Sequence, residues 1–236
     1  MANGLALQPR LRAIADLVPD GARLVDVGTD HGFIPVDLLL SERIQFAIAS
    51  DIGAAPLDHA RRTAEQHDVT EGIEFRLCDG LKDVAPSEVD CIVIAGMGGD
   101  NIASILENAQ WTRENTLLIL QPMSKAEVLR RWLPSNGYRV IAEQLVADKG
   151  VIYPILSVRG GQMTAKDDAQ FWGGFLLSED PLRERYLDEQ ILRLRRAAAG
   201  LEKAKDSAVQ QRRSELCTII SGLEQQKKGD RNANSI

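Results

Sequence analysis

The stretch from Leu24 to Gly32 reads Leu-Val-Asp-Val-Gly-Thr-Asp-His-Gly, an apolar strand that runs directly into a turn rich in Gly and Asp. Gly28 and Gly32 permit positive φ and a close approach of the backbone to a ligand. The spacing lacks the Gly-x-Gly-x-x-Gly run that lays a pyrophosphate on a helix N-terminus. Carboxylates at Asp26 and Asp30 would repel phosphates and suit the sulfonium and amino group of S-adenosylmethionine better than a dinucleotide. The alternative is a Gly-rich strand-to-helix turn of any α/β protein.

Length and composition predict a globular protein. The 236 residues suffice for one large domain, or one domain with an appendage, and the composition is 44% hydrophobic and 26% charged. No run approaches the roughly 20 apolar residues that span a bilayer, and residues 1–8 lack a signal-peptide pattern. We therefore expect a cytoplasmic protein with no membrane partner. The cysteines are far apart and no His, Cys or carboxylate cluster has ligand spacing, so we expect no disulfide and no metal.

Short apolar runs alternate with amphipathic segments over the first 160 residues, which is typical of parallel strands joined by crossover helices. The expected strands are 23–27, 46–51, 73–77, 91–95, 116–121, 138–146 and 151–158, with helices over 7–17, 34–41, 55–67, 102–108 and 125–136. The last two strands are too close for a helical crossover, so they must be antiparallel. This order predicts a Rossmann-like class I methyltransferase fold, with a mostly parallel seven-stranded sheet and an antiparallel last strand. At Pro154, inside that strand, we expect a bulge or local fraying.

The character of the sequence changes after Gly161, so we expect a methyltransferase domain over residues 1–161 and a C-terminal α-helical coiled-coil domain over 162–236. A helix is expected over 163–177, interrupted by glycines, and Asp180 with Pro181 is expected to cap and begin the next one. Apolar residues then follow heptad spacing at Leu187, Ile191, Leu194, Ala198 and Leu201, and at Val209, Leu216 and Leu223. The pattern predicts a helical hairpin or a long bent helix, with a turn near 204–208.

Charge is divided unevenly along the chain. Residues 182–236 carry 12 Lys and Arg against 8 Asp and Glu, a net +4, whereas residues 1–181 carry 16 against 26, a net −10. A basic tail on an acidic body favours a nucleic-acid partner that binds through the tail. A solvated, charged helix face is the alternative.

Each expected strand end presents a candidate binding residue, because ligands of open α/β sheets lie beyond the carboxyl ends of the strands. Asp51 ends the second strand and could accept both hydroxyls of a ribose, or else cap the following helix. Asp79 ends the third strand and could accept from an adenine amino group, or else form an ordinary Asp-Gly turn. The glycines of 96–99 leave the backbone bare for a planar base or a methyl donor. Gln121 could bond a base edge or serve as a structural amide.

Four segments together resemble the bacterial tRNA (adenine-22-N1)-methyltransferase family: Leu7–Leu11, Asp26–His31, Ile94–Gly99 and Leu118–Pro122. The resemblance covers nearly the whole chain, since family members also carry a C-terminal helical segment like residues 171–226. It implies S-adenosylmethionine as the methyl donor and N1 of adenine 22 in the D-loop of tRNA as the acceptor.

The strand ends and the resemblance together define the candidate site. Cofactor-binding candidates are Asp26, Gly28, Thr29, Asp30, His31, Gly32, Asp51, Ile52, Cys78, Asp79, Gly80, Leu81, Gly96, Met97 and Gly98. Candidates for tRNA contact are Arg10, Gln121 and Tyr153, with Arg193, Arg195 and Arg196 on the tail. N1 of neutral adenine can attack the methyl group directly when held in line at about 3 to 3.5 Å, so positioning should dominate catalysis. Asp30 is the catalytic candidate, as acceptor of the N6 proton that becomes acidic once N1 is alkylated.

Two other functions fit the same pattern. One is a methyltransferase for a small molecule, with a tail used only for dimerisation, and the other is a non-catalytic module whose coiled coil recruits a partner. The expected partner is tRNA, and the expected state is a monomer or a weak homodimer.

Overall fold

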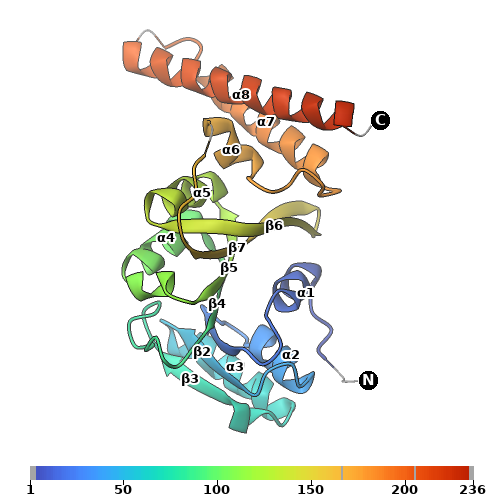
Figure 1. Cartoon of the computed structure of the whole chain (residues 1–236), viewed down its shortest axis with the longest axis vertical. Helices are drawn as coiled ribbons and strands as arrows, with labels where there is room; N and C mark the ends of the chain where they lie inside the picture. Colours follow the sequence, from blue (N-terminus) through green and yellow to red (C-terminus); the bar gives the residue numbers. More distant parts are fainter. Residues whose placement is uncertain (1–3, 166, 205, 234–236) are drawn as a thin grey trace. The chain divides into compact units, whose positions relative to one another are not determined.

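The computed structural model describes residues 4–165, 167–204 and 206–233 (Figure 1). The chain divides into two compact units, one up to Met163 and one from Thr164 onward. Over the described ranges, no helix combines the length and apolar character needed to cross a membrane.

The first unit is built on one sheet of seven strands in the order β3-β2-β1-β4-β5-β7-β6. Its strands are β1 (Arg23–Val27), β2 (Phe46–Asp51), β3 (Ile73–Leu77), β4 (Cys91–Gly98), β5 (Leu117–Ser124), β6 (Tyr138–Asp148) and β7 (Val151–Gly160). The helices are α1 (Pro9–Asp16), α2 (Phe33–Leu40), α3 (Ala54–Gln66), α4 (Gly99–Glu107) and α5 (Ala126–Ser135), with short 3-10 turns η1 (Thr70–Gly72) and η2 (Gln110–Arg113). β1 to β5 pair in parallel, and β7 is antiparallel to both β5 and β6. The predicted fold class is confirmed.

Burial explains why the central strands form. β1 and β2 are almost wholly buried, and so are the first halves of β4 and β5, which are continuous apolar runs rather than alternating ones. Runs of this kind suit parallel strands covered on both faces by helices. The carboxyl ends of β1, β2 and β4 therefore meet at one edge of the sheet, where the candidate residues follow the strands.

The expectation of a bulge at Pro154 is wrong. β7 continues through this residue, which pairs with Leu145 of β6, and the irregularity of this ladder lies instead between Val140 and Ala142. β5 pairs with β7 only over Leu156–Val158, so at Pro154 the strand has a neighbour on one side only. A proline is tolerated there, because its missing N–H can face the side without a partner strand.

The buried carboxylate of Asp37 holds α1 in place. It accepts hydrogen bonds of 2.8 Å from both terminal nitrogens of Arg12, and one of 2.7 Å from the backbone N–H of Leu5. A buried carboxylate needs such partners, since an unpaired charge away from water is costly. This anchor fixes the N-terminal segment and α1, which carry three of the residues lining the cavity described below.

The second unit is helical, with α6 (Asp168–Gly173), α7 (Arg183–Gly200) and α8 (Ser207–Ala233). α6 is much shorter than the predicted helix over 163–177, because Gly174 at its C-cap has a φ of +91° that ends it. Asp180 accepts a 2.8 Å hydrogen bond from the N–H of Leu182, just before α7 begins. α7 ends at Gly200 and α8 begins at Ser207, so the break between them overlaps the turn predicted near 204–208.

α7 and α8 form an antiparallel hairpin rather than one bent helix. The ion pairs connect the start of α7 with the later part of α8, and the end of α7 with the earlier part of α8, as expected for antiparallel neighbours. The pairs are Asp188 with Lys227, Arg195 with Glu224, and Glu202, just after α7, with Arg213. The predicted heptad residues from Leu187 to Ala198 are buried with Leu216 and Leu223, and Ala169 and Trp172 of α6 join the same apolar cluster.

Candidate functional site

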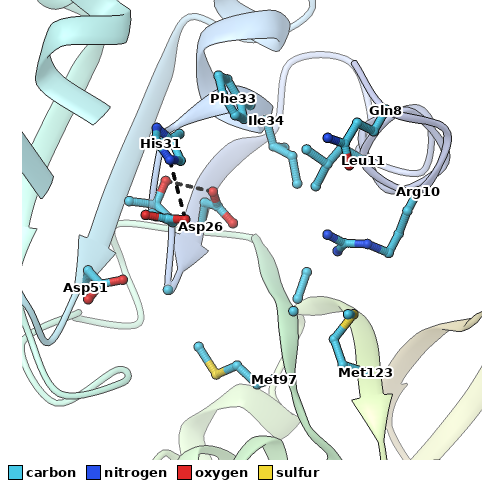
Figure 2. A pocket seen from close by; sticks show the side chains of 15 residues that line it. Gln8, Arg10, Leu11, Asp26, His31, Phe33, Ile34, Asp51, Met97 and Met123 are labelled. Atoms are coloured by element: carbon cyan, nitrogen blue, oxygen red, sulfur yellow. Dashed lines mark hydrogen bonds and ion pairs between the residues drawn. The ribbon is translucent and has the colours of Figure 1, made fainter. Parts of the chain in front are cut away.

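A cavity of about 540 Å³ opens at the carboxyl ends of the central strands (Figure 2). Figure 2 shows Asp26 and Asp51 on one side of it and Arg10 on the other, with Met97 and Met123 along a further wall. Its lining residues are Gln8, Arg10, Leu11, Asp26, Gly28, Thr29, Asp30, His31, Phe33, Ile34, Asp51, Ala95, Gly96, Met97 and Met123. The predicted cofactor residues of the turn after β1, from Asp26 to His31, therefore share one cavity with Asp51. Its size suits a cofactor-sized molecule.

The carboxyl group of Asp26 lies at the end of β1 and is buried. The Thr29 hydroxyl donates a 2.8 Å hydrogen bond to it, and burial raises the pKa of this group from 3.8 to about 6. Desolvation disfavours the charged form, which is why the pKa rises despite the hydrogen bond. Asp26 is therefore poised to bind a cation that restores its charge.

The turn after β1 requires its glycines. Gly28 has a φ of +74°, and a Cβ on it would collide with the end of the Met97 side chain. Gly32 has a φ of +67°, and a Cβ there would meet that of Ala60 at 2.9 Å. The N–H groups of Gly28 and Thr29 both donate to the carbonyl of Ser50, at 2.8 and 3.0 Å, which ties the turn to β2. The backbone of the turn is thus fixed at the cavity wall.

A second cavity of about 290 Å³ adjoins the first, and the two share Gly28, Asp51 and Met97. The other lining residues are Val27, Ile52, Cys78, Asp79, Gly80, Asn101, Ser104 and Ile105. One oxygen of Asp51 accepts a 2.8 Å hydrogen bond from the N–H of Gly53, the N-cap of α3, and the side chain also borders both cavities. Both interpretations of Asp51 therefore have structural support.

The residues after β3 divide between two environments. Asp79 is exposed and pairs with Lys82 at 2.5 Å, while the Ile52 side chain opposite it is 73% exposed although it is apolar. Leu81 is buried and lines a third, smaller cavity rather than the second one. An exposed apolar side chain at the mouth of a cavity offers a surface against which a flat ring can pack.

The glycine run that ends β4 has two structural uses. Gly96 has a φ of +79°, and a Cβ there would meet no atom within 4 Å, so its backbone faces open space. At Gly99 a Cβ would collide with the carbonyl of Lys125, so this glycine permits the close approach of α4 to α5. The ladder between β4 and β5 shifts register between Ala95 and Met97, and Ala95, Gly96 and Met97 line the cavity.

Gln121 is not placed to read a base edge. The side chain is fully buried, and its oxygen accepts hydrogen bonds from Arg10 at 2.8 Å and from the N–H of Gly96 at 3.2 Å. Its nitrogen donates to the carbonyl of Pro122. These contacts support the alternative interpretation, a structural amide at the strand end. Arg10 lines the cavity, whereas Tyr153 is half-buried on β7 and lines neither cavity.

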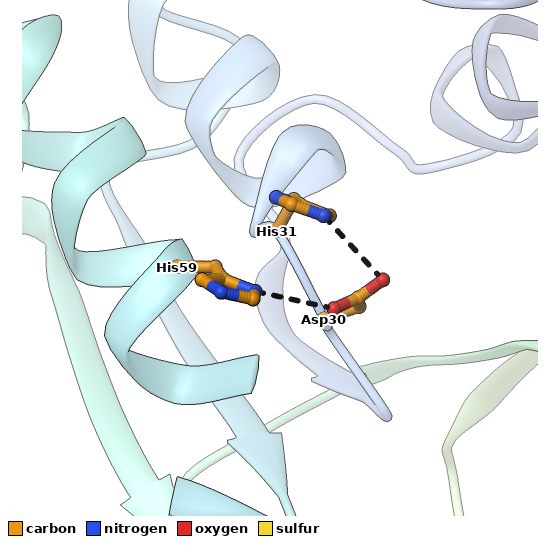
Figure 3. A group of neighbouring side chains, drawn as sticks. All are labelled: Asp30, His31 and His59. Atoms are coloured by element: carbon orange, nitrogen blue, oxygen red, sulfur yellow. Dashed lines mark ion pairs between the residues drawn. The ribbon is translucent and has the colours of Figure 1, made fainter. Parts of the chain in front are cut away.

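Asp30 lies beside two histidines, which sequence spacing did not reveal (Figure 3). Its carboxylate is 3.7 Å from Nε2 of His31 and 3.8 Å from Nδ1 of His59, which comes from α3. The His31 ring stacks on His59 with centroids 4.8 Å apart, and on Phe33 at 5.1 Å. The premise that no ligand cluster exists was wrong, because His59 is brought to the turn by the packing of α3.

Several cavity residues were missed from sequence. Gln8, Leu11, Phe33, Ile34, Ala95 and Met123 line the first cavity, and Asn101, Ser104 and Ile105 line the second. The last three lie at helical spacing on α4, directly after the glycine run, and that spacing was a signal that could have found them. Gln8, Leu11 and Ala95 lie within the quoted segments but were not singled out, and Phe33, Ile34 and Met123 follow such segments by one to three residues.

The three tail arginines predicted for tRNA contact, Arg193, Arg195 and Arg196, lie on α7 and are exposed. Arg195 pairs with Glu224 at 2.6 Å, and Arg193 lies over the ring of Trp172, at 5.3 Å from its centroid. The structural boundary also changes the charge balance, since residues 164–236 carry 13 Lys and Arg against 12 Asp and Glu. The positive charge therefore belongs to the hairpin alone, and part of it is neutralised by local ion pairs.

Comparison with known proteins agrees with this geometry. Residues 7–156 match a family described as a methyltransferase domain. The tRNA (adenine(22)-N(1))-methyltransferase of Bacillus subtilis is 36% identical over 167 residues, which cover 70% of each chain. The chain belongs to this family.

Solved structures of tRNA (adenine-22-N1)-methyltransferases are also similar. That of the m1A22 tRNA methyltransferase of Bacillus subtilis has a TM-score of 0.86 at 28% identity, covering 94% of this chain and 99% of that one. A putative tRNA (m1A22) methyltransferase of Streptococcus pneumoniae, in complex with S-adenosyl-L-methionine, has a TM-score of 0.81 at 32% identity, with 92% and 98% covered.

Proposed function

We propose that the chain transfers a methyl group from S-adenosylmethionine to N1 of adenine 22 of tRNA, in the cytoplasm, as a monomer or weak homodimer. The observation that carries the proposal is the pair of carboxylates, Asp26 and Asp51, on one cavity beside Gly28, in a member of this family. S-adenosylmethionine supplies the electrophilic methyl group, and the residues of this chain bind and orient the reactants.

The donor set of the two cavities fits the cofactor. Asp26, buried with a raised pKa, would hold the ammonium group, and the free oxygen of Asp51 would accept from the ribose hydroxyls. Ile52 would pack against the adenine ring, with Asp79 and the backbone of residues 78–80 at its edge. These roles follow from charge and position, since carboxylates bind cationic and hydroxyl groups with strong, charge-assisted hydrogen bonds.

The target adenine would enter the larger cavity from the side of α1. The bare backbone of Gly96 leaves room for a flat ring, and Met123 and Arg10 border the same space. An adenine must leave its stack and its pairing to reach an enclosed site, which costs a few kcal/mol. Asp30 at the rim would accept the N6 proton after alkylation, because its exposed carboxylate borders the cavity.

The helical hairpin would bind the tRNA backbone. Arg196 and Lys228 are exposed, and most other cations of α7 and α8 are engaged in ion pairs. Phosphate contacts from Lys and Arg supply sequence-independent affinity and position a nucleic acid on a protein.

Labelled methyl transfer tests the proposal. The full-length protein is incubated with radiolabelled S-adenosylmethionine and an unmodified tRNA transcript, and the matched control is the same transcript with guanine at position 22. We expect up to one methyl group per adenine-22 transcript, mapped to that base by mass spectrometry, and none on the control. Equal labelling of both transcripts, or labelling of neither, would contradict the proposal.

The role of Asp30 has its own test. Asp30→Ala should lower kcat more than it lowers S-adenosylmethionine affinity, because an interaction made during proton loss acts on the reaction and not on the ground state. A variant that loses cofactor affinity while keeping its single-turnover rate at saturating cofactor would show that Asp30 only binds the cofactor.

A further inference from the structure

We propose that Asp30, His31 and His59 form a binding site for a borderline divalent metal ion, with Zn²⁺ as its representative. Each residue offers one ligand atom, and these three atoms lie within 4.8 Å of one another. Among the described residues, this is the group of three His, Cys, Asp or Glu side chains whose ligand atoms lie close enough together to share one ion. The site does not include Asp26 or Asp51, but Asp30 and His31 also line the first cavity, so a bound ion would take the place of the proton-accepting role proposed for Asp30.

The imidazole of His59 lacks a hydrogen-bond partner where it faces the cluster. Its Nδ1 atom is shielded from solvent and bonds to no atom of the described residues, since the nearest Asp30 oxygen is 3.8 Å away. A buried polar nitrogen without a partner carries a desolvation penalty of about 1 to 3 kcal/mol. A metal ion placed between Nδ1 and the carboxylate would satisfy both groups.

The backbone and the ring stack bring the three ligands together. Asp30 has a φ of +46°, and its carboxylate faces both imidazoles, as Figure 3 shows. The His31 and His59 rings are within 11° of parallel, and His31 is also stacked on Phe33. The two rings present Nε2 and Nδ1 to the same carboxylate from two different elements, the turn after β1 and α3.

The ligand set selects the ion. Two imidazoles and a carboxylate suit Zn²⁺, Ni²⁺ or Cu²⁺, whereas Mg²⁺ and Ca²⁺ prefer sets made of oxygen alone. Ligand atoms around tetrahedral zinc, at bonds of about 2.0 Å, lie roughly 3.3 Å apart. The Asp30 carboxylate is 3.7 and 3.8 Å from the two nitrogens, and all three ligand atoms lie within 4.8 Å of one another. To bind an ion, the imidazoles must rotate out of their parallel stack until both in-plane lone pairs point at it. Three protein ligands leave one position open, on the side where Asp30 and His31 line the cavity.

Zinc binding to the full-length protein, with any affinity tag removed, tests the inference by calorimetry. We expect one Zn²⁺ per chain for the wild type, and at least tenfold weaker binding for His31→Gln and for His59→Gln. His67→Gln is the matched control, since His67 is an exposed histidine that follows α3 and lies outside the cluster. MgCl₂ should give no binding.

The result that would overturn the site is a wild-type affinity for Zn²⁺ unchanged in both cluster variants, or no binding at all. Circular dichroism and thermal unfolding show whether each variant is folded, so a lost metal site is distinguishable from a lost fold. The outcome is independent of the proposed methylation, because the metal alone is the probe.

Discussion

The two units of the chain differ in what they bury. In the first unit, Asp26, Asp37 and Gln121 are among the polar side chains withdrawn from solvent, and Asp30 is one of several non-glycine residues with positive φ. In the second unit, the apolar cluster holds no charged side chain, and several charged side chains of the described residues lie on the outside in ion pairs. Every buried polar side chain of the described chain belongs to the first unit.

This difference suggests that the two units have different roles. Buried polar groups and left-handed backbone cost stability, and they persist where surrounding structure holds them for a function. An apolar seam with surface ion pairs, each worth at most about 1 kcal/mol, needs no such explanation. We therefore assign cofactor binding and methyl transfer to the first unit and tRNA attachment to the second, and each prediction below tests that division.

The largest effect is expected for Asp51→Ala. Loss of a charge-assisted hydrogen bond to the ribose should weaken S-adenosylmethionine binding by about 1.5 to 3 kcal/mol, roughly 10- to 150-fold in Kd. Calorimetry measures it, and Asp90→Ala is the control, since Asp90 is a half-buried carboxylate that pairs with Arg23 at the start of β1. If Asp51→Ala binds like the wild type, the ribose assignment is wrong.

A smaller effect is expected from pH. Burial raises the pKa of Asp26 from 3.8 to about 6, so the group is protonated at pH 5 and charged at pH 7. Affinity for the cationic cofactor should therefore rise with pH across this range, by up to roughly tenfold if only the carboxylate form binds.

Asp26→Asn separates this group from its neighbours. The variant should bind more weakly at pH 7 and show a flat profile, because its side chain does not titrate. A rise of the same size in the variant would assign the titration to another group.

The smallest effect concerns the hairpin. Arg196→Gln with Lys228→Gln should lower the slope of log tRNA affinity against log salt by about 1 to 2, since each lost phosphate contact contributes about 0.7 to 0.9. The matched pair on the first unit is Arg62→Gln with Lys149→Gln, which are also exposed cations. If both pairs of substitutions lower the salt dependence of tRNA binding equally, the proposal that the hairpin binds the tRNA backbone is wrong.

The sheet could be predicted from sequence because its central strands are apolar runs bounded by polar turns. The ends of β4 and β5 could not. Met97 pairs with Pro122, and Gly98 with Ser124, although none of these segments has a strand pattern. Pairing with a neighbouring strand extends them, and single-sequence patterns do not contain that information.

The site shows the same limit. The glycine turn after β1 and Asp51 follow from local rules, since they need only a strand and its end. The role of Gln121 depends on Arg10, 111 residues away, and the cluster at Asp30 depends on His59, which packs there through α3. Such contacts are set by tertiary structure, so spacing along the chain cannot reveal them.

Residues 1–163 expressed alone provide the most direct test of the division between units. This boundary is preferred to a cut at Leu182, which would expose Ala169 and Trp172 from the apolar cluster of the second unit. Calorimetry should give an S-adenosylmethionine Kd within about twofold of the full-length value, while kcat/KM for tRNA falls at least tenfold. A folded fragment that has lost the cofactor, or one that methylates tRNA as efficiently as the full chain at every salt concentration, would contradict the account.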